Sequence, residues 1–565
     1  MKKTAPWTMV VLLAACGGSE RAVSGDPFCQ AVIPRVEAFL ERARAEHPTP
    51  SDERYGGTVV VGGYGEISDG MNGAVSADYT ATQHQQFVNQ MTLLDYDESF
   101  QPRPYLAERW EIAEDGRSIT FHLRQDVFWH DGERTDAEDV VFTWEVVTDP
   151  LTAFPNPAFW DYYVKGREGI EVLDDFTVRI RLEPHADFLD PFRTLGILPE
   201  HLLGDVPHER LGEHPYGTQC PVGNGPFVFV EHRPNERWVF EANPAFPVAL
   251  GGRPFVDRYV YRVIPEQTTL LAELLTGNVD VYISPSADQA QAILDNPSIE
   301  LLAYTFKNYV MVAWNSRRPQ LADARVRRAL TMGTDRETIV ASILRGYGQV
   351  AHGSVPPFHW AYDPAAIDRI EYDPAGARAL LEEAGWHDRD GDGVRESADG
   401  TRLSISIKYN PNQQRQQMTE IMQSQLAAIG VEVRPQVVEY TTLIQQITSS
   451  DRDFDGVMIG WNVEFKLDDM DLFHSSRIDQ PYAWSGTRNA EIDRLLEAIS
   501  RTADREEAKA LWREYQNLLA AEQPYTFFYT QSRLDGVNRR VRGVVMDVRG
   551  EWVNLKDWYL DPASR

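Results

Sequence analysis

The stretch from Leu106 to Glu145 reads LAERWEIAEDGRSITFHLRQDVFWHDGERTDAEDVVFTWE and is the most informative part of the chain. Apolar and polar residues alternate in two runs around Glu114-Asp115-Gly116, which is typical of two strands joined by a hairpin turn. After a second turn at His130-Asp131-Gly132, Thr135 and Glu138 have the spacing of a capping box and predict the start of a helix. The apolar residues of the two runs and of the helix face are Trp110, Ile112, Ile119, Phe121, Leu123, Phe128, Val140, Val141 and Trp144.

The same stretch closely resembles the signature of the family 5 extracytoplasmic solute-binding proteins of ABC importers, the oligopeptide, dipeptide and nickel-binding class. The family pattern is LAxxWExxxDGxxxTFxLRxxVxWHDGxxxTAxDVVFTW, from which Asp136 beside Ala137 is a small departure. Other segments also resemble family motifs: PVGNGPFVF from Pro221, ADARVRRALTMGTDRETIVASILRG from Ala322 and YDPAGARALLEEAGW from Tyr372. The resemblance extends from Gly56 to about Leu560, so it implies a family for nearly the whole chain.

Strands alternate with helices over most of the length, which indicates an α/β architecture. The resemblance implies a periplasmic-binding-protein-like fold of the class II or cluster C type, with a cleft between two lobes and an extra subdomain in the first lobe. It places lobe I at residues 56–99, 217–304 and 528–565, the subdomain at 100–216, and lobe II at 305–527. Residues 322–346 predict two helices joined at Gly333-Thr334-Asp335. We expect Arg325, Arg327 and Arg328 on a solvated helix face, and a role as ligands is the alternative.

The chain has 565 residues and a formal net charge of −30. This charge argues against nucleic-acid binding, which needs a basic surface. It fits a solvated acidic surface, and the alternative is a field that attracts cationic ligands.

The first residues predict export. Lys2 and Lys3 precede a short apolar run, and Leu13-Ala14-Ala15-Cys16 resembles a bacterial lipobox. We therefore expect a signal peptide at residues 1–15, lipidation of Cys16, and a tether with an N-terminal extension at residues 16–55. The lipid would anchor the protein in the periplasm or on the outer face of the cell envelope, and no other stretch approaches the 18 or so apolar residues of a membrane span. The alternative is an ordinary secretory signal.

Two further cysteines, Cys29 and Cys220, remain after lipidation. In an exported chain such a pair can form a disulfide, which here would attach the N-terminal extension to the globular body. Two buried free thiols are the alternative.

A run of acidic residues from Asp388 to Asp399 has the spacing of a calcium-binding loop. Five side chains and one backbone carbonyl would supply oxygen ligands: Asp388, Asp390, Asp392, Val394, Glu396 and Asp399. The last position carries Asp where Glu is usual, and the alternative is an acidic turn, since the family often has a Gly-Asp-Gly turn here. The predicted role is structural, and calorimetry of chelator-treated protein would measure Ca²⁺ binding directly.

The sequence offers no recognisable catalytic set. The GxSxG, HExxH, Walker and CxxC motifs are absent, and the 13 histidines show no metal-ligand spacing. We therefore expect no enzymatic activity and no required cofactor. A secreted hydrolase with an unfamiliar site is the remote alternative.

The ligand site is predicted after the strand that starts at Asp455, in DGVMIGWNVEFKLDDMDLF, because ligands of α/β folds lie outside the carboxyl ends of strands. This segment resembles the family's GWxADxxDP motif, in which the main chain pairs with a bound peptide and an acidic side chain binds its α-ammonium. The resemblance implies that Gly460 and Asn462 offer backbone groups, Trp461 forms a pocket wall, and Glu464 holds the ammonium. Tyr64, Asn72, Tyr309 and Trp314 are weaker candidates for lining the cleft, and core positions are the alternative for each.

The sequence thus predicts a binding protein that captures a peptide-like ligand between two lobes and delivers it to ABC permease subunits, as a monomer. A same-fold binder of a nickel complex, a sugar or haem, and a ligand sensor, are the alternatives.

Overall fold

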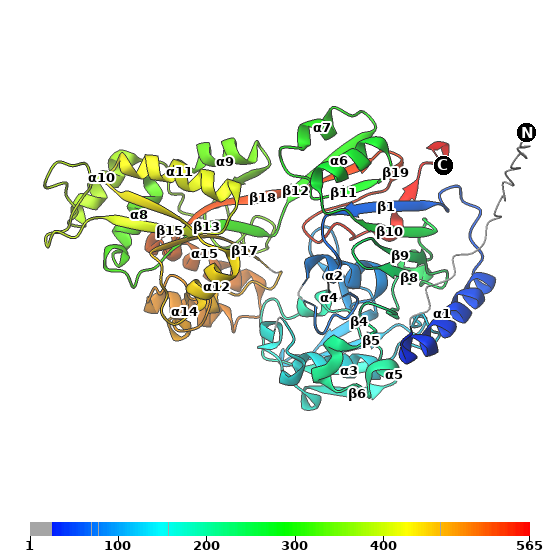
Figure 1. The fold of residues 1–565 in the computed structure, drawn as a ribbon. Helices are drawn as coiled ribbons and strands as arrows, with labels where there is room; N and C mark the ends of the chain where they lie inside the picture. The colour runs from blue at the N-terminus through cyan, green and yellow to red at the C-terminus, as the bar shows by residue number, and fades with distance from the viewer. Residues whose placement is uncertain are drawn as a thin grey trace, which may run out of the picture.

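Residues 25–68, 70–76, 78–155, 157–365, 367–463 and 465–564 are described by the structure, which is a computed structural model. The chain forms two lobes side by side, and a narrow connection joins them (Figure 1). Cys16 and Glu464 lie outside the described residues. No helix within the described ranges is both long and apolar enough to cross a membrane.

One mixed sheet runs through both lobes. Among the described residues its strand order is β16-β15-β17-β13-β18-β11-β1-β10-β9-β8, and β12 and β14 also pair with β18. The strands are β1 (Thr58–Gly63), β8 (Phe227–Arg233), β9 (Arg237–Ala242), β10 (Arg258–Val263), β11 (Val281–Ile283), β12 (Ile299–Thr305), β13 (Asn308–Trp314), β14 (Gly348–Val350), β15 (Ser404–Tyr409), β16 (Glu432–Val437), β17 (Gly456–Asn462) and β18 (Tyr525–Asn538). Strands and helices mix throughout, so the predicted α/β class is confirmed.

Strand β18 belongs to both lobes. Its first residues pair with β13 and β14 in lobe II, and its residues from Ser532 onward pair with β12 and β11 in lobe I. The other crossing is the short link Phe306–Lys307 between β12 and β13. The chain therefore passes between the lobes at two adjacent places, and the predicted boundary between residues 527 and 528 falls inside β18.

The stretch from Leu106 to Glu145 forms the start of the lobe I subdomain. A four-stranded sheet has the order β4 (Ala107–Ile112), β5 (Ser118–Leu123), β7 (Thr177–Arg181), β6 (Ile170–Asp174), and α3 (Ala137–Thr148) packs against β6 and β7. The predicted hairpin is confirmed. The predicted capping box is displaced by one residue. The Asp136 side chain caps α3 by accepting a hydrogen bond from the Glu138 backbone, and the Asp139 side chain accepts one from the Asp136 backbone. Thr135 is instead fully buried, where its hydroxyl accepts a hydrogen bond from Asn224.

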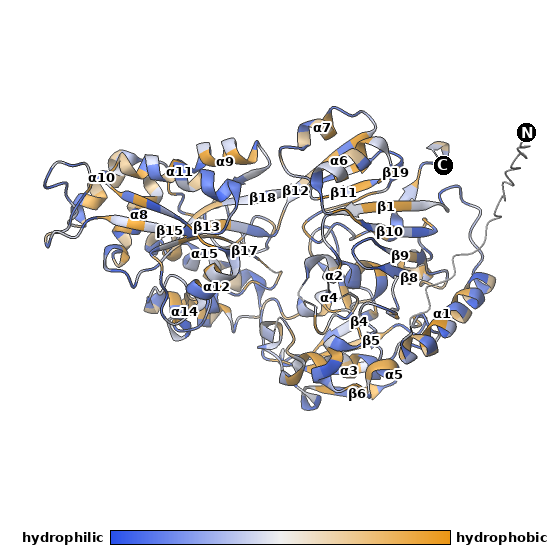
Figure 2. Ribbon diagram, in the orientation of Figure 1, coloured by the Kyte–Doolittle hydropathy of each residue, from blue (hydrophilic) through white to orange (hydrophobic). Residues whose placement is uncertain are grey.

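The helices cover the sheets on both sides and bury their apolar residues against them. Hydrophobic and hydrophilic residues are interspersed along the strands and helices, and α3 is rich in hydrophobic residues (Figure 2). The other helices are α1 (Pro27–Glu46), α2 (Tyr79–His84), α4 (Pro191–Thr194), α5 (Glu200–Leu203), α6 (Gln267–Thr276), α7 (Ala290–Leu294), α8 (Ala324–Met332), α9 (Arg336–Leu344), α10 (Pro374–Glu383), α11 (Gln413–Ala427), α12 (Tyr440–Thr448), α13 (Met470–Phe473), α14 (Ala490–Ile499) and α15 (Arg505–Glu522). Short antiparallel pairs complete the architecture: β2 (Leu94–Tyr96) with β3 (Pro102–Pro104), and β19 (Val541–Arg542) with β20 (Tyr559–Leu560).

The two helices predicted between residues 322 and 346 are α8 and α9, but one of their arginines is not solvated. The side chain of Arg327 is fully buried and donates hydrogen bonds to the backbone carbonyls of Leu321 and Gln523 and to Glu522. Its guanidinium satisfies carbonyls at the C-terminal end of α15, which have no partner within that helix. The residue ties α8 to α15, and its role is structural.

A disulfide between Cys29 and Cys220 attaches α1 to the body, with a Cα–Cα distance of 5.6 Å. The helix buries Val32, Val36, Phe39 and Leu40 in the subdomain core. The opposite face of α1 is exposed and polar. The N-terminal extension is therefore an integral layer of lobe I.

Candidate functional site

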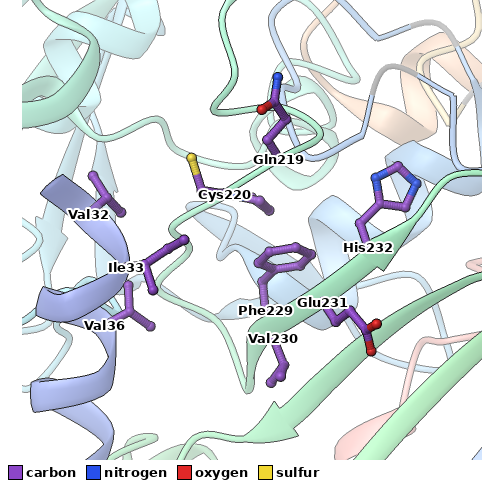
Figure 3. A pocket seen from close by; sticks show the side chains of 10 residues that line it. Val32, Ile33, Val36, Gln219, Cys220, Phe229, Val230, Glu231 and His232 are labelled. Atoms are coloured by element: carbon purple, nitrogen blue, oxygen red, sulfur yellow. The ribbon is translucent and has the colours of Figure 1, made fainter. Parts of the chain in front are cut away.

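A large cavity lies between the lobes. Its volume is about 1410 Å³, and its lining comes from lobe I, the subdomain, both crossings and lobe II. Small-molecule sites usually measure about 300–1,000 Å³. A second cavity beside Cys220, between α1 and β8, measures only about 40 Å³ (Figure 3). That volume is too small for a ligand. The interlobe cleft includes Gly460, Trp461 and Asn462, which the sequence predicts as ligand-binding residues, so it is the candidate site.

The wall of the cleft in lobe II is the end of β17. Gly460, Trp461 and Asn462 line it, as the sequence predicts. β17 runs parallel to β15 and antiparallel to β13, so Trp461 lies opposite Tyr309. The cleft thus lies outside the carboxyl end of a parallel strand pair, where ligands of α/β folds bind. Tyr309 also lines the cleft, although its side chain is almost entirely buried.

Aromatic rings surround Trp461. Its ring lies 5.5 Å from those of Tyr482 and Trp484, nearly perpendicular to both. Tyr482 is 46% exposed and lines the cleft, and so does Tyr64 of lobe I at 49% exposure. Edge-to-face contacts hold the Trp461 ring in place, so the cleft carries a rigid aromatic wall on one side.

Two predicted lining residues lie elsewhere. Asn72 is buried and donates a hydrogen bond to the Leu211 carbonyl inside the subdomain. Trp314 is buried between β13 and β18, where its indole donates to the Thr526 hydroxyl at 2.9 Å. Both residues stabilise the scaffold, and neither lines the cleft. Glu464 lies outside the described residues, so its role stays a prediction.

Charges of both signs line the cleft in equal number. Among the described lining residues, six are acidic and six are basic, so their formal sum is zero: Glu66, Asp78, Asp161, Asp468, Asp469 and Asp471 against Arg193, Lys307, Lys466, Arg477, Arg533 and Arg549. The chain as a whole carries −30. The acidity therefore belongs to the outer surface, and these residues do not form a selectively cation-attracting cleft.

The pKa values of two carboxyl groups in the cleft are shifted in opposite directions. Burial raises the pKa of Glu66, but the nearby His232 imidazole and hydrogen bonds from Trp238 and the backbone outweigh it and lower the pKa to about 2. Asp469 is fully buried, and burial raises its pKa to about 6 although Ser354 and Tyr515 donate hydrogen bonds to it. Glu66 is thus a fixed anion in lobe I, whereas Asp469 changes charge near pH 6 in lobe II.

A buried charge cluster lies at the crossing of β18. Arg533 lies 2.7 Å from Glu551, and Tyr79 donates a hydrogen bond to the other oxygen of Glu551. Asp535 accepts hydrogen bonds from the Tyr304 hydroxyl and from Ser284. Burial, together with the nearby Glu551 charge, raises the pKa of Asp535 to about 7. Arg533 therefore faces two buried carboxyl groups where β18 and the link Phe306–Lys307 pass between the lobes, a region that we call the hinge.

The predicted calcium loop is only partly assembled. Carboxylate oxygens of Asp388, Asp390 and Asp392 lie within 4.8 Å of one another, and all three residues are exposed. Asp399 does not join them, because it accepts hydrogen bonds from Ser397 and Thr401 in its own turn. Glu396 instead accepts from the Arg389 backbone, and the Val394 amide donates to Asp392. Calcium binding stays a prediction.

Several residues that line the cleft were not predicted from the sequence. A π-helical turn at Gln85–Asn89 extends α2 and places Gln85 and Gln86 in the cleft. Such turns often occur at functional sites, but no residue type marks them in the sequence. Asp468 and Asp469 lie in the segment that the sequence singled out, and only the burial of Asp469 distinguishes the two.

Comparison with known proteins gives the family. The model of the bacterial extracellular solute-binding proteins, family 5 Middle, matches residues 101–482. The chain belongs to this family. The oligopeptide-binding protein AppA of Bacillus subtilis is 31% identical over 519 residues, which cover 89% of this chain and 92% of AppA.

Solved structures agree with this assignment. The structure of AppA in complex with a nonapeptide aligns with a TM-score of 0.74 at 29% identity, covering 90% of this solute-binding protein and 99% of AppA. The structure of NikZ from Campylobacter jejuni in complex with Ni(L-His) aligns with a TM-score of 0.73 at 25% identity, with 89% and 99% coverage. The periplasmic-binding-protein-like fold of this family 5 protein is confirmed.

Proposed function

We propose that this solute-binding protein captures a peptide between its lobes and delivers it to the permease of an ABC importer. The observation that carries the proposal is the interlobe cleft of about 1410 Å³ with balanced charges. A peptide is a zwitterion with an extended backbone, so it suits a long cleft that offers charges of both signs. The similarity to AppA, whose structure contains a nonapeptide, supports the same ligand class.

The recognition mode follows from the end of β17. We propose that backbone groups of Gly460 and Asn462, which line the cleft at the end of β17, pair with an extended peptide as in the addition of a strand. The aromatic wall of Trp461 and Tyr482 accepts an apolar side chain of the ligand. We assign the α-ammonium of the peptide to Glu464, because a carboxylate and an ammonium form a charge-assisted hydrogen bond.

The test is peptide binding by the Glu464→Gln variant. Mass spectrometry of the ligand that copurifies with the protein defines the peptide, and calorimetry then measures its affinity. We expect Glu464→Gln to weaken binding of a free-amine peptide by about tenfold or more, since one charge-assisted bond is lost. Binding of the N-acetylated peptide should change little. Glu337→Gln, at an exposed position on α9, is the matched control.

Unchanged affinity in Glu464→Gln would remove the ammonium assignment. A copurified nickel complex, sugar or haem would replace the peptide as the ligand, and a ligand that leaves chemically altered would indicate an enzyme. We propose that the ligand leaves unchanged, since the family is one of binding proteins. Loss of peptide uptake on deletion of the gene would support transport, whereas normal uptake would favour a sensor.

We also propose that Cys16 carries a lipid that anchors the protein in the periplasm or on the outer envelope face. The support is the sequence Leu13-Ala14-Ala15-Cys16 after a charged start and a short apolar run. In cell fractionation, the wild type should remain with the membranes. Cys16→Ser should appear in the soluble exported fraction with its ligand affinity retained, and continued membrane association of this variant would refute the anchor.

A further inference from the structure

The lobes also contact each other through residues outside the two crossings. Asp187 of the subdomain reaches into lobe II, where its carboxylate accepts hydrogen bonds from the Trp360 indole at 2.7 Å and the Leu467 amide at 3.3 Å. Arg505 lies 3.7 Å from the same carboxylate. The Asp187 side chain is 1% exposed, and both of these hydrogen bonds come from lobe II. Opening of the lobes would break all three interactions together.

Apolar packing supports the same contact. Ala186 is part of the hydrophobic core of lobe II, although it belongs to the subdomain. In the other direction, Phe465 of lobe II lies buried among Tyr96, Phe100 and Val548 of lobe I. These insertions bury surface that an open protein would expose to water, so they favour the closed arrangement.

Residues 465–468 of lobe II contact the subdomain of lobe I at several points. The Arg193 guanidinium lies 4.0 Å from the ring centre of Phe465, and Lys466 lies 4.4 Å from that of Tyr162. Asp468 accepts a hydrogen bond from the Tyr162 hydroxyl at 3.1 Å. This segment follows residues 460–463 of the cleft wall closely in sequence. A ligand that orders the wall also restrains the segment that contacts lobe I.

We infer that Asp187, Trp360, Arg505 and residues 465–468 form a latch that favours the closed state without ligand, with Asp187 as its positioning residue. The latch extends the proposed function, because the closed fraction sets the apparent affinity for any ligand that binds the closed state. It specifies no ligand chemistry. Its primary test is therefore the distance between the lobes in ligand-free protein.

The experiment is single-molecule energy transfer between dyes at Val248→Cys in lobe I and Val437→Cys in lobe II. These positions are 85% and 59% exposed, and the disulfide cysteines do not react with the dyes. We expect a substantial closed population in the ligand-free wild type. Asp187→Asn and Trp360→Phe should each shift this population toward the open distance. In Asp187→Asn an amide nitrogen, which does not accept a hydrogen bond, faces the Leu467 N–H, and in Trp360→Phe the indole donor is missing. Ligand dissociation should become about tenfold or more faster.

A matched control separates closure from folding. Asp139 is also buried, burial raises its pKa to about 6 as it does for Asp187, and it accepts a hydrogen bond from the Trp129 indole at 2.9 Å. This pair lies within the subdomain, so Asp139→Asn should affect thermal stability while leaving the lobe distance unchanged. Phe465→Ala tests the apolar half of the latch and should also open the protein.

The outcomes distinguish the latch from the proposed function. A ligand-free wild type that is only open, or Asp187→Asn and Trp360→Phe proteins that close like the wild type, would overturn the latch. If peptides fail to bind while these variants open, the latch stands and the peptide assignment fails. If peptides bind with unchanged dissociation rates and unchanged lobe distances in the variants, the function stands and the latch fails.

Discussion

Replacing Arg533 by methionine is expected to lower the free energy of unfolding by about 3–5 kcal/mol at pH 8, which is typical when one partner of a buried ion pair is removed. Glu551 and Asp535 are both fully buried, and Arg533 is the cation that faces them. Methionine fills much of the same volume but carries no charge. Two carboxyl groups would then remain in a low-dielectric site without a counterion. Chemical unfolding followed by tryptophan fluorescence measures the loss.

The loss should depend on pH with a definite sign. In the wild type the pKa of Asp535 is raised to about 7, above its unfolded value, so its favourable contribution is present below about pH 4 and is lost as pH rises through 7. Without Arg533 the pKa of Asp535 should rise further, because the nearby cation lowers it in the wild type. The difference between variant and wild type should therefore be greatest near pH 8 and smaller near pH 5.

Arg539→Met is the matched control for Arg533→Met. Arg539 follows the last residue of β18 and pairs with Glu300 at 3.2 Å, but both side chains are about half exposed. An exposed pair contributes about 0–1 kcal/mol. Equal losses in the two variants would contradict the assignment of a buried charge cluster to the hinge.

Removing the disulfide is expected to lower the free energy of unfolding by about 2–5 kcal/mol. The bond joins residues separated by 191 positions, so the Cys29→Ser/Cys220→Ser variant frees a long loop in the unfolded chain. In the folded state, α1 would be held by its apolar face and by the ion pairs Arg35–Asp131 and Arg44–Glu241. Reduction of the wild type should reproduce the loss, and α1 should become more sensitive to proteases.

The ligand site provides the internal control for this second prediction. The cleft does not include α1 or either cysteine, so the double variant should bind its ligand with wild-type affinity at 25 °C. Identical unfolding of oxidised and reduced protein would show that α1 is held by packing alone. Arg44→Gln, which removes an exposed ion pair on the same helix, should cost no more than about 1 kcal/mol.

Local patterns in the sequence predicted the local structure well. The hairpin around Glu114-Asp115-Gly116 and the helices on either side of Gly333 form where turn and capping chemistry place them. Arg327 shows where such reasoning stops, because its burial depends on carbonyls nearly 200 residues away in α15. Trp314 fails as a site prediction for the same reason, since a tryptophan in a strand suits a core and a cleft equally.

The sequence predicted only the part of the candidate site in which a family motif coincides with the end of a strand. Gly460, Trp461 and Asn462 follow from that rule, but the opposite walls come from α2, the subdomain and the two crossings. Residue types alone do not show which elements meet across a gap between lobes. The contact of Asp187 with Trp360 is one example, because 173 residues separate the partners and neither belongs to a recognisable motif.

The position of β18 determines when this protein can finish folding during its synthesis. Both halves of the sheet use this strand: β13 and β14 pair with its beginning, and β11 and β12 pair with its end. It lies at residues 525–538 of 565. Until β18 is synthesised, the part of the sheet in each lobe has unpaired backbone N–H and C=O groups along one edge. Neither lobe can therefore complete its fold before that point. Both lobes therefore stay incompletely folded until β18 has been made, which suits passage through a membrane channel before folding.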